Sequence, residues 1–319
     1  MKLDGSRVLI LGGGGFIGSN LSRMLAEQGA RVTCFDHKMP EEAEKGVSYI
    51  EGDFFDFEQV QRALGETEAV VHAISTITPS SSMNKYMEGY ERDFIATLRM
   101  LNEAAARGVR VEFLSSGGTI YGEALQERIP EETALNPINH YGCVKACIEQ
   151  VMRQFRRDGA DFRIARIGNA YGPGQNYLGG VGFIDAAIKC ALEGRPVQVW
   201  GDGENVRDYI YIEDICTLLC AILAFEGSEF LFNVGTGVGT SQNEVIRLIR
   251  ERIPGVQVQY CASRAVDVHR NVLDTTVCTR AFGFKPRELK QGIDEYIEFL
   301  QARSWLNRHD AGCIPDEVM

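Results

Sequence analysis

Residues 7–29 read RVLILGGGGFIGSNLSRMLAEQG, and this stretch decides the fold. It starts with a run of leucine, isoleucine and valine, passes through a glycine cluster and continues with apolar residues at helical spacing. A short apolar run predicts a buried strand, and apolar residues three and four positions apart predict an amphipathic helix. The stretch therefore predicts a strand, a tight turn and a helix in direct succession.

The glycines of the turn have a chemical meaning as well as a structural one. Gly12, Gly15 and Gly18 give the spacing G-x-x-G-x-x-G, which differs by one residue from the common dinucleotide fingerprint G-x-G-x-x-G. Glycine suits this place because backbone N–H groups must come close to a pyrophosphate at a helix N-terminus, whose partial positive charge favours the anion. A glycine-rich turn can also be no more than a turn, so the following segments must decide.

Asp36 ends the next expected strand, ARVTCFD at residues 30–36. A carboxylate at this distance from the glycines can accept hydrogen bonds from the adenosine ribose hydroxyls of a dinucleotide. It would repel a 2′-phosphate, so NAD is favoured over NADP. The alternative is a solvated residue at a strand end, and the glycines upstream favour the role in cofactor binding.

Strand and helix patterns continue to alternate. Strands are expected at residues 47–54, 68–75 and 109–116, and helices at residues 56–65 and 86–108. Units of this length predict an α/β fold with a Rossmann-type, doubly wound parallel sheet and right-handed crossovers. In such sheets ligands bind beyond the carboxyl ends of the strands. Three polar or glycine-containing segments fall at those ends: GDF (52–54), HAIS (72–75) and LSSGG (114–118).

Composition narrows the class of partner. The 319 residues are 45% hydrophobic and 24% charged, as in a soluble globular protein, and the net charge of −11 comes without a basic block. We therefore expect no nucleic acid and no membrane partner, and a small-molecule substrate instead. The nine cysteines show no C-x-x-C pair, which predicts neither a disulfide framework nor a metal site. No apolar run is long enough to span a bilayer, so a cytoplasmic location is expected.

With these features in place, the chain resembles the extended short-chain dehydrogenase/reductase family, in particular its branch of NAD-dependent nucleotide-sugar epimerases and dehydratases, and most of all the UDP-hexose 4-epimerases. The resemblance covers nearly the full length. It rests on eight motifs that follow one another in the family's order: GGGGFIG, GDF, SSGGTIYG, YGCVK, RIGNAYGPG, GDGENVRDYIYIEDI, FNVGTG and SRAVDV.

Tyr141 and Lys145 stand four residues apart in a stretch that is expected to be helical. A free tyrosine has a pKa of about 10 and needs help to act as a base near neutral pH. Positions i and i+4 share one helix face, so Lys145 can place a positive charge near Tyr141, and a cationic nicotinamide would add to it. The resemblance implies that Tyr141 takes and returns a sugar hydroxyl proton, while Lys145 also binds the nicotinamide ribose.

One position departs from the family. A serine or threonine usually stands four residues before the tyrosine of SSGGTIYG, and here that place is taken by Gly117. Nearby hydroxyls are Thr119 and Ser116, and we expect Thr119 first, and Ser116 next, to act as the proton-relay partner. The glycine pair is also expected to leave space for a bulkier sugar substituent or a water.

The resemblance implies further binding residues. A nucleoside diphosphate would be held by Asn169, by the arginines Arg207 and Arg264, and by the segment from Gln198 to Trp200, with Asp267 at the ribose or bracing an arginine. Guanidinium groups suit phosphate geometry. The pocket around the sugar is expected near Asn271 and the hydroxyl-rich segment STITPSSS (75–82). The cofactor NAD would be contacted by Gly12, Gly15, Phe16, Ile17, Gly18, Asp36, Asp53, Phe54, Ala73, Ser115, Tyr141 and Lys145.

The motifs also bear on the reaction. A 4,6-dehydratase of this family carries an acidic pair where this chain has Gly118 and Thr119, and the related decarboxylases carry a glutamate at the position of Thr119. The expected activity is therefore 4-epimerisation of UDP-glucose, UDP-glucuronate or a UDP-N-acetylhexosamine, through oxidation at C4 and hydride return to the other face. The alternatives are a nucleotide-sugar 4-ketoreductase and a non-catalytic dinucleotide sensor.

The second half is expected to be interleaved with the first. Helices are expected at residues 182–194, 211–225 and 241–253 and a strand at residues 196–203. The Rossmann domain would comprise residues 1–173 and about 208–237, the smaller substrate-binding domain about 174–207 and 238–310, and a tail 311–319. Family members pair through the long helix and the helix that carries Tyr141, so a homodimer is expected. Three apolar residues belong either to that seam or to the core: Leu98, Leu101 and Ile148.

Overall fold

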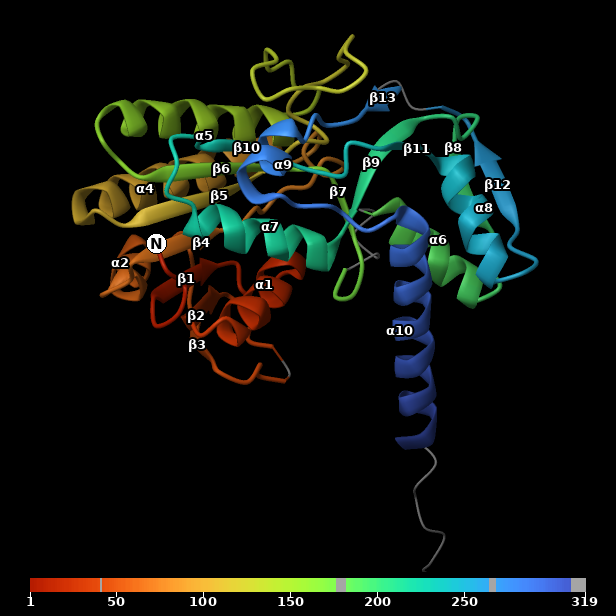
Figure 1. The fold of residues 1–319 in the computed structure, drawn as a ribbon, viewed down its shortest axis with the longest axis horizontal. Helices are drawn as coiled ribbons and strands as arrows, with labels where there is room; N and C mark the ends of the chain where they lie inside the picture. Colours follow the sequence, from red (N-terminus) through yellow and green to blue (C-terminus); the bar gives the residue numbers. More distant parts are fainter. Residues whose placement is uncertain (41, 176–181, 264–267, 311–319) are drawn as a thin grey trace, which may run out of the picture.

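The computed structural model describes residues 1–40, 42–175, 182–263 and 268–310, and it confirms the doubly wound parallel sheet (Figure 1). Seven strands run in the order β10-β6-β5-β4-β1-β2-β3, and every neighbouring pair is parallel. Their bounds are β1 Arg7–Leu11, β2 Arg31–Asp36, β3 Val47–Glu51, β4 Ala69–His72, β5 Arg110–Ser116, β6 Phe162–Ile167 and β10 Leu231–Val234.

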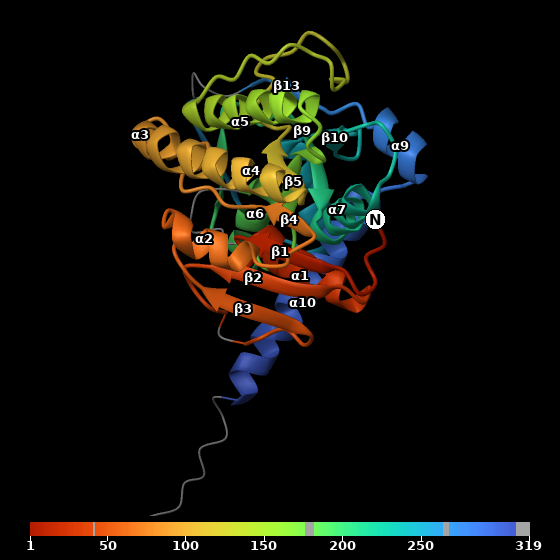
Figure 2. The same cartoon turned by 90° about the vertical axis from the view of Figure 1, so that its left-hand side faces the viewer.

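Helices cover both faces of this sheet, which is why the central strands β1 and β4 consist almost wholly of buried apolar residues (Figures 1 and 2). One face packs against α1 (Phe16–Glu27) and α7 (Ile212–Ala224). The other packs against α2 (Phe57–Leu64), α4 (Ile95–Arg107) and α5 (His140–Arg157). Two separate apolar cores result, one on each side of the sheet.

The strand order reverses between β1 and β4. From β1 the chain proceeds outward to β2 and β3, then returns to β4 on the other side of β1 and continues to β5 and β6. The loops after β1 and β4 therefore diverge and leave a crevice at the carboxyl edge of the sheet, which is the place where open α/β sheets bind ligands.

Most of the remaining elements form a smaller second part, whereas α9 (Thr276–Phe282) packs against β10 and α7 at the main sheet. A four-stranded sheet has the order β11-β9-β13 with β7 paired to β9, and β12 and β8 form a two-stranded sheet. Figure 1 shows α10 leaving this part at a steep angle to the main sheet. The bounds are β7 Asn169–Tyr171, β8 Val197–Trp200, β9 Val206–Tyr211, β11 Gly239–Ser241, β12 Val258–Cys261, β13 Arg270–Asn271, α6 Phe183–Leu192, α8 Gln242–Arg252, α9 Thr276–Phe282 and α10 Leu289–Asp310.

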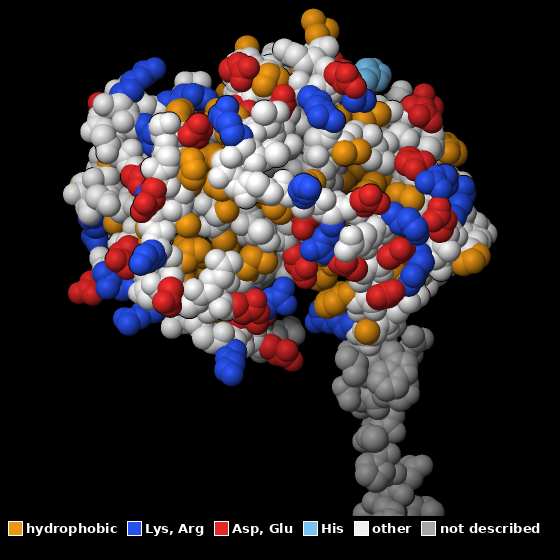
Figure 3. Space-filling model, in the orientation of Figure 1, with side chains coloured by type: hydrophobic (Ala, Val, Ile, Leu, Met, Phe, Trp, Pro, Cys, Tyr) orange, Lys and Arg blue, Asp and Glu red, His pale blue; other side chains and the backbone are white. Residues whose placement is uncertain are grey.

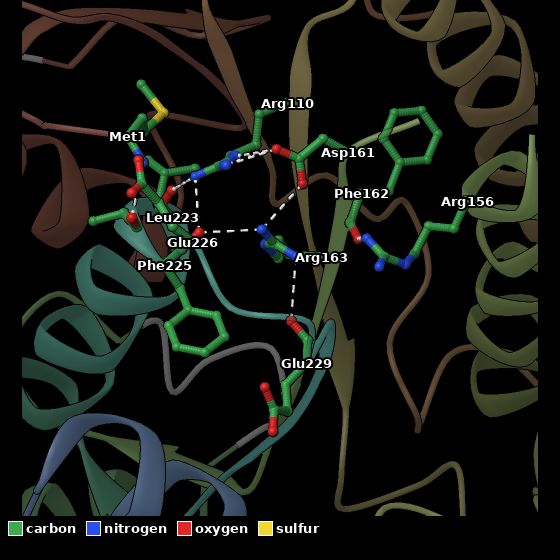
Figure 4. Close-up of polar contacts among 11 residues, drawn as sticks. Met1, Arg110, Arg156, Asp161, Phe162, Arg163, Leu223, Phe225, Glu226 and Glu229 are labelled. Atoms are coloured by element: carbon green, nitrogen blue, oxygen red, sulfur yellow. Dashed lines mark hydrogen bonds and ion pairs between the residues drawn. The ribbon is translucent and has the colours of Figure 1, made fainter. Parts of the chain in front are cut away.

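A polar cluster ties the returning segment to the main sheet at the edge opposite the crevice (Figure 4). Arg110 of β5 and Arg163 of β6 both pair with Asp161, at 2.6 and 3.1 Å. Arg110 also donates to the carbonyl oxygens of Leu223 and Phe225, where α7 ends. Arg110 thereby satisfies two carbonyl groups at the carboxyl end of α7. The structure places α7 and β10 against the main sheet. The division of the chain into two domains remains our interpretation.

The long helix expected at residues 86–108 is not a single α-helix. The structure has a short turn α3 (Tyr86–Glu88), a π-helix η1 (Gly89–Phe94) and then α4. Gly89 packs so closely on Ile77 that a Cβ atom there would overlap its side chain. The widened turn also directs Asp93 inward, where it is 3% exposed.

Leu101 and Ile148 are buried within the core under α4 and α5, while Leu98 is half-buried. The structure therefore places the first two in the core. Charged side chains of both signs are interspersed over the face seen in Figure 3, with no basic patch on that face. Among the described residues, no helix has the length and apolarity needed to cross a bilayer.

Glu112 provides a test of the packing on β5. It is fully buried, neither carboxylate oxygen has a hydrogen-bond partner among the described residues, and burial raises its pKa well above the ordinary value of 4.5, against the pull of Arg163 and Arg110. The protonated form therefore favours folding below pH 4.5, and that stability is lost as the pH rises through the folded-state pKa.

We expect Glu112→Gln to raise the free energy of unfolding by about 1–3 kcal/mol at pH 8, and by much less at pH 4.5, because the amide does not ionise. Urea unfolding at both pH values measures the difference. Glu27→Gln removes an exposed carboxylate of α1 and is the matched control. A gain that is equal at both pH values would contradict the burial argument.

Candidate active site

A cavity of about 810 Å³ lies at the carboxyl edge of the main sheet and extends between that sheet and the second part. It is walled by the loops after β1, β4, β5 and β6, by the first turns of α1 and α5, and by α6 and β8. The cavity brings together most of the residues that the sequence indicates: Gly12, Gly15, Phe16, Ile17, Gly18, Ala73, Ser115, Ser116, Thr119, Tyr141, Lys145, Asn169, Gln198, Trp200 and Arg207.

The glycine loop opens α1 without a side-chain cap. Gly15 precedes the helix in an extended conformation, and no side chain satisfies the first N–H groups. Gly18 packs against the carbonyl of Gly12 so closely that a Cβ atom would overlap it, and Gly12 has a φ of +90°, which favours glycine. The loop therefore brings unsatisfied N–H groups to the cavity at the positive end of a helix, a fitting cradle for a pyrophosphate.

Asp36 lies beside this loop rather than on the cavity wall. Its carboxylate accepts the Gly14 N–H at 2.9 Å and contacts His37 Nδ1 at 2.8 Å. Two other expected cofactor residues also lie off the wall. Asp53 is exposed and accepts the Phe55 N–H at 2.9 Å, and Phe54 is buried with its ring 5.1 Å from that of His72. The roles of Asp36, Asp53 and Phe54 in binding stay predictions.

Tyr141 occupies the first turn of α5, and Lys145 lies one turn further. The side chain of Asn139 caps the helix by accepting the Gly142 N–H at 2.8 Å. At Gly142 a Cβ atom would lie 2.9 Å from the carbonyl oxygen of Thr119, so this glycine allows α5 to approach the loop after β5. Lys145 is 4% exposed, donates to the Leu114 carbonyl at 2.9 Å, and has its Nζ 5.6 Å from the Tyr141 ring centroid.

The protein's own groups together raise the pKa of Tyr141, and the expected lowering also depends on the positive charge of a bound nicotinamide. Burial raises it to about 12, with a further increase from the negative charge of Asp93, and a hydrogen bond with Ser116 acts in the opposite direction. Burial also lowers the pKa of Lys145 to about 8, against the opposing effects of Asp93 and Glu149.

The two candidate hydroxyls differ in their surroundings. A hydrogen bond from Ser116 acts to lower the pKa of Tyr141, whereas the buried Thr119 Oγ1 has no hydrogen-bond partner among the described residues. The structure thus favours Ser116 over Thr119 as the neighbour of the phenol. A third hydroxyl, that of Ser115, is turned to Glu149, to which it donates at 2.7 Å.

Gly117 does not leave open space, and the expectation of room at both glycines was wrong in this respect. A Cβ atom at Gly117 would lie 2.7 Å from Leu273 Cδ1 and 3.1 Å from the Arg166 carbonyl oxygen. At Gly118 it would meet only Asn169, at 3.7 Å. Leu273, far along the chain, therefore occupies the space that a side chain at position 117 would need.

The structure describes only some of the residues that are expected to hold the substrate. Asn169, Gln198, Trp200 and Arg207 line the cavity, while Arg264 and Asp267 lie outside the described residues. Asn271 was expected near the sugar but does not line the cavity. It is fully buried and donates to the Gly117 carbonyl at 3.0 Å, so β13 braces the loop from behind.

Sequence reasoning missed several cavity residues: Pro79 and Ser75 were noted only within a hydroxyl-rich segment, and Gln175, Arg195, Asn205 and Gln242 not at all. It also missed Asp93, although a signal was present. Asp93 falls in register with Thr97, Met100 and Leu101 on the buried stripe of its helix, where a carboxylate is unusual.

The cavity is positive although the chain is acidic. The ionised side chains among the described residues of its wall are Lys145, Arg195 and Arg207, and no Asp or Glu is among them. Arg195 is paired with Glu193 at the rim. A chain with a net charge of −11 that keeps its carboxylates off one cavity provides a site for anionic ligands.

The comparisons with known proteins agree with this fold and site. The profile described as "NAD dependent epimerase/dehydratase family" matches residues 8–235, and the chain belongs to this family. The expectation of NAD as cofactor is confirmed by that membership. Three features of the cavity wall fit such a cofactor: the glycine loop, the uncapped start of α1, and Lys145.

The particular relatives are nucleotide-sugar enzymes. The UDP-glucose 4-epimerase of Mycolicibacterium smegmatis is 28% identical over 312 residues, covering 93% of this chain and 99% of that protein. The crystal structure of the Thermotoga maritima UDP-glucose 4-epimerase with UDP-glucose superposes with a TM-score of 0.86 at 29% identity, covering 93% and 99%. That of the Thermus thermophilus enzyme complexed with NAD has a TM-score of 0.85 at 31% identity, covering 92% and 98%.

The same family carries out other reactions. An Escherichia coli dTDP-4-dehydro-6-deoxyglucose reductase is 27% identical over 314 residues, covering 93% of this chain and 98% of that protein. The chain is thus an enzyme of the epimerase/dehydratase family, and its reaction must be argued from its own site.

Gly117 and Gly118 offer a direct test of the crowding. We expect Gly117→Ser to lower the free energy of unfolding by about 1–3 kcal/mol, because the new side chain must displace Leu273 and press on the Arg166 backbone. Gly118→Ser is the matched control and should cost less, since its surroundings allow a Cβ atom. Urea unfolding compares the two. A stable Gly117→Ser protein with faster turnover would show that the missing hydroxyl can be restored, against this account.

Proposed function

We propose that the protein is an NAD-dependent 4-epimerase of a UDP-sugar. The observation that carries the proposal is the cavity itself, which has Tyr141, Lys145 and Ser116 at the end next to the glycine loop and Arg207 toward the second part, with no carboxylate among its described lining residues. One end suits a dinucleotide and a reacting hydroxyl, and the other suits a diphosphate.

The chain's residues would divide the work as follows. Lys145 and the glycine loop orient the cofactor, and Arg207, Asn169 and Trp200 hold the nucleoside diphosphate. When bound, NAD supplies the hydride acceptor and donor and a positive charge that favours the Tyr141 phenolate. Tyr141 takes the proton of the C4 hydroxyl as the C4–H hydride leaves, and it returns that proton after the keto sugar has turned its other face.

Ser116 is the hydroxyl that we assign to the proton path, since it interacts with Tyr141. The residues that line the cavity argue against a dehydratase, which eliminates water from the sugar. A dehydratase needs an acid and a base beside C5 and C6, and the positions after Gly117 are Gly118 and Thr119. A ketoreductase would need the same pair of residues, Tyr141 and Lys145, but would release its oxidised cofactor in every turnover. This difference distinguishes a ketoreductase from an epimerase by experiment.

We also propose that two copies pair through the outer faces of α4 and α5. Met83, Tyr86, Met87 and Ile95 are exposed apolar residues on or next to the α3–α4 segment. Burying such side chains is favourable and would account for their exposure in a single chain. Light scattering of the purified protein should give twice the chain mass, and Ile95→Glu should reduce it to the single-chain mass. A single-chain mass for the unaltered protein would refute the pairing.

The reaction is tested by incubating the protein with UDP-glucose, UDP-glucuronate and UDP-N-acetylglucosamine, followed by separation of the C4 epimers. We expect one of the three to be interconverted with its 4-epimer without net formation of NADH. Tyr141→Phe should reduce turnover by at least about a hundredfold, because the proton acceptor is removed.

Two further variants separate the hydroxyls. Ser116→Ala is expected to slow turnover by about tenfold or more, and Thr119→Ala to affect it less. Net NADH production without an inverted product would favour a dehydrogenase or ketoreductase. Unchanged turnover in Tyr141→Phe would remove the basis of the proposed chemistry.

A further inference from the structure

Asp208 is a buried carboxylate directly behind the cavity wall, and the proposed reaction does not use it. It follows Arg207 in β9, and successive side chains of a strand point to opposite faces. Arg207 accordingly lines the cavity, whereas Asp208 does not and is 0% exposed. In Figure 1, β9 lies between the main sheet and the helices α6 and α8 of the second part. A charge that is costly to bury needs an explanation in what it holds.

Four neutral donors surround this carboxylate. Oδ1 accepts the Thr236 N–H at 2.8 Å and the Thr236 hydroxyl at 2.6 Å. Oδ2 accepts the Gly237 N–H at 3.0 Å and the Leu273 N–H at 3.2 Å. Gly235 permits this approach, since a Cβ atom there would lie 2.6 Å from Oδ2. One side chain of β9 therefore joins the loop after β10 and the segment that follows β13.

The backbone of Asp208 meets the carboxyl end of β6. Its carbonyl oxygen accepts a side-chain N–H of Asn169 at 3.4 Å, and a Cβ atom at Gly168 would lie 3.0 Å from the same oxygen. Both Gly168 and Asn169 line the cavity. At this point β9 is therefore packed directly on two residues of the cavity wall.

The segment around β13 carries these contacts on to the loop after β5. Asn271 is the register partner of Arg207, and its side chain donates to the Gly117 carbonyl at 3.0 Å. The Leu273 side chain occupies the space next to Gly117. The residue before Gly117 is Ser116, which lines the cavity. The strand with Arg207 and the loop with Ser116 are therefore joined through one short segment of chain.

We propose that Asp208 is a positioning residue of the active site: its carboxylate holds β9, the loop after β10 and the end of β13 as one unit, so that Arg207 stands at a set distance from Ser116. The inference rests on the proposed function, in which Arg207 holds the diphosphate and Tyr141 acts at the sugar hydroxyl beside Ser116. A ligand that reaches both places is aligned only when this distance is right. Misplacement by about 1 Å can cost about a hundredfold in rate.

A purely structural role is the alternative, because a buried carboxylate with four hydrogen bonds also stabilises the folded chain. The two explanations predict different results. A structural role lowers the fraction of folded protein and leaves the folded molecules unchanged, whereas a positioning role slows the reaction in folded molecules. Turnover must therefore be expressed per binding site for UDP, counted by calorimetric titration.

Thr236 allows a mild test that leaves the carboxylate in place. Thr236→Val has the same shape but removes the hydroxyl that donates to Asp208 and accepts the Val238 N–H at 3.1 Å. Thr236→Ser keeps that hydroxyl and is the conservative variant. Thr217→Val makes the same change at an exposed threonine of α7 and is the matched control. Asp208→Asn is the stronger change, because an amide cannot accept all of the bonds that the carboxylate accepts.

We expect Thr236→Val to reduce kcat per UDP site by about tenfold and Asp208→Asn to reduce it further, with the Kd of UDP changed by less than about twofold. UDP alone engages the Arg207 end and can follow it, whereas the reaction needs both ends in register. Thr236→Ser and Thr217→Val should stay within about twofold of the unaltered protein in both quantities. If Asp208→Asn does not fold, the three threonine variants decide the question.

Hydrogen exchange tests the link to the loop after β5 without any substrate. In this loop the Ile120 N–H bonds to the Ser116 carbonyl at 3.1 Å. We expect the peptide that covers residues 117–121 to exchange about fivefold faster in Thr236→Val, and at the original rate in Thr236→Ser and Thr217→Val. An unchanged exchange rate in Thr236→Val would overturn the proposal. A loss of UDP sites with unchanged kcat per site would overturn it as well.

The two readouts separate this inference from the proposed function. If no UDP-sugar is turned over but exchange of residues 117–121 rises as expected, the proposed function fails and the link from Asp208 to the loop stands. If a UDP-sugar is turned over and neither kcat nor exchange responds to Thr236→Val, the proposed function stands and the role of Asp208 fails.

Discussion

The close attachment of α5 to β5 is the constraint on which the active site depends. Lys145 donates to the Leu114 carbonyl, and Glu149 accepts from Ser115 while it pairs with Arg166 of β6. Gly142 lets the first turn of the helix meet the loop after β5 without overlap. These contacts fix the distance between the helix and the strand end, so that the Tyr141 phenol stands beside Ser116 at the floor of the cavity. A pair that is fully buried, such as Glu149 with Arg166, adds positional definition more than net stability.

Acidic side chains are placed in a definite way around the cavity. An acidic chain keeps its carboxylates off the described wall of its main cavity, while buried acids stand just behind that wall. The wall can then attract anionic ligands, and the acids behind it adjust the groups that face them. Burial raises the pKa of Tyr141 to about 12, so the phenol form is favoured near neutral pH. A positive charge brought next to this phenol lowers its pKa, so a cationic ligand favours the phenolate.

Much of the fold could be predicted from local patterns. The glycine loop, the alternating elements and the Tyr141–Lys145 spacing are short-range features, and each leads directly to a strand, a helix or a shared helix face. The crowding at Gly117 could not be predicted, because Leu273 lies just after β13, 156 residues further on in the chain. The π-helical turn and the inward position of Asp93 likewise depend on contacts with Ser75, Thr76 and Ile77. Asn271 was misplaced for the same reason: its role follows from the pairing of β13 with β9, which has no local signature.

The order of strands has a consequence for how the chain reaches its folded state. β10 completes the sheet beside β6, and α7 covers one of its faces, yet both follow the first segments of the second part in sequence. Until residue 234 has left the ribosome, β6 is an edge strand with unpaired backbone groups and one apolar face uncovered. The nascent chain therefore stays only partly folded until this late segment has been synthesised. During that time its exposed surface can associate with other chains. Long-range closure of this kind slows folding and makes protection of the young chain by chaperones valuable.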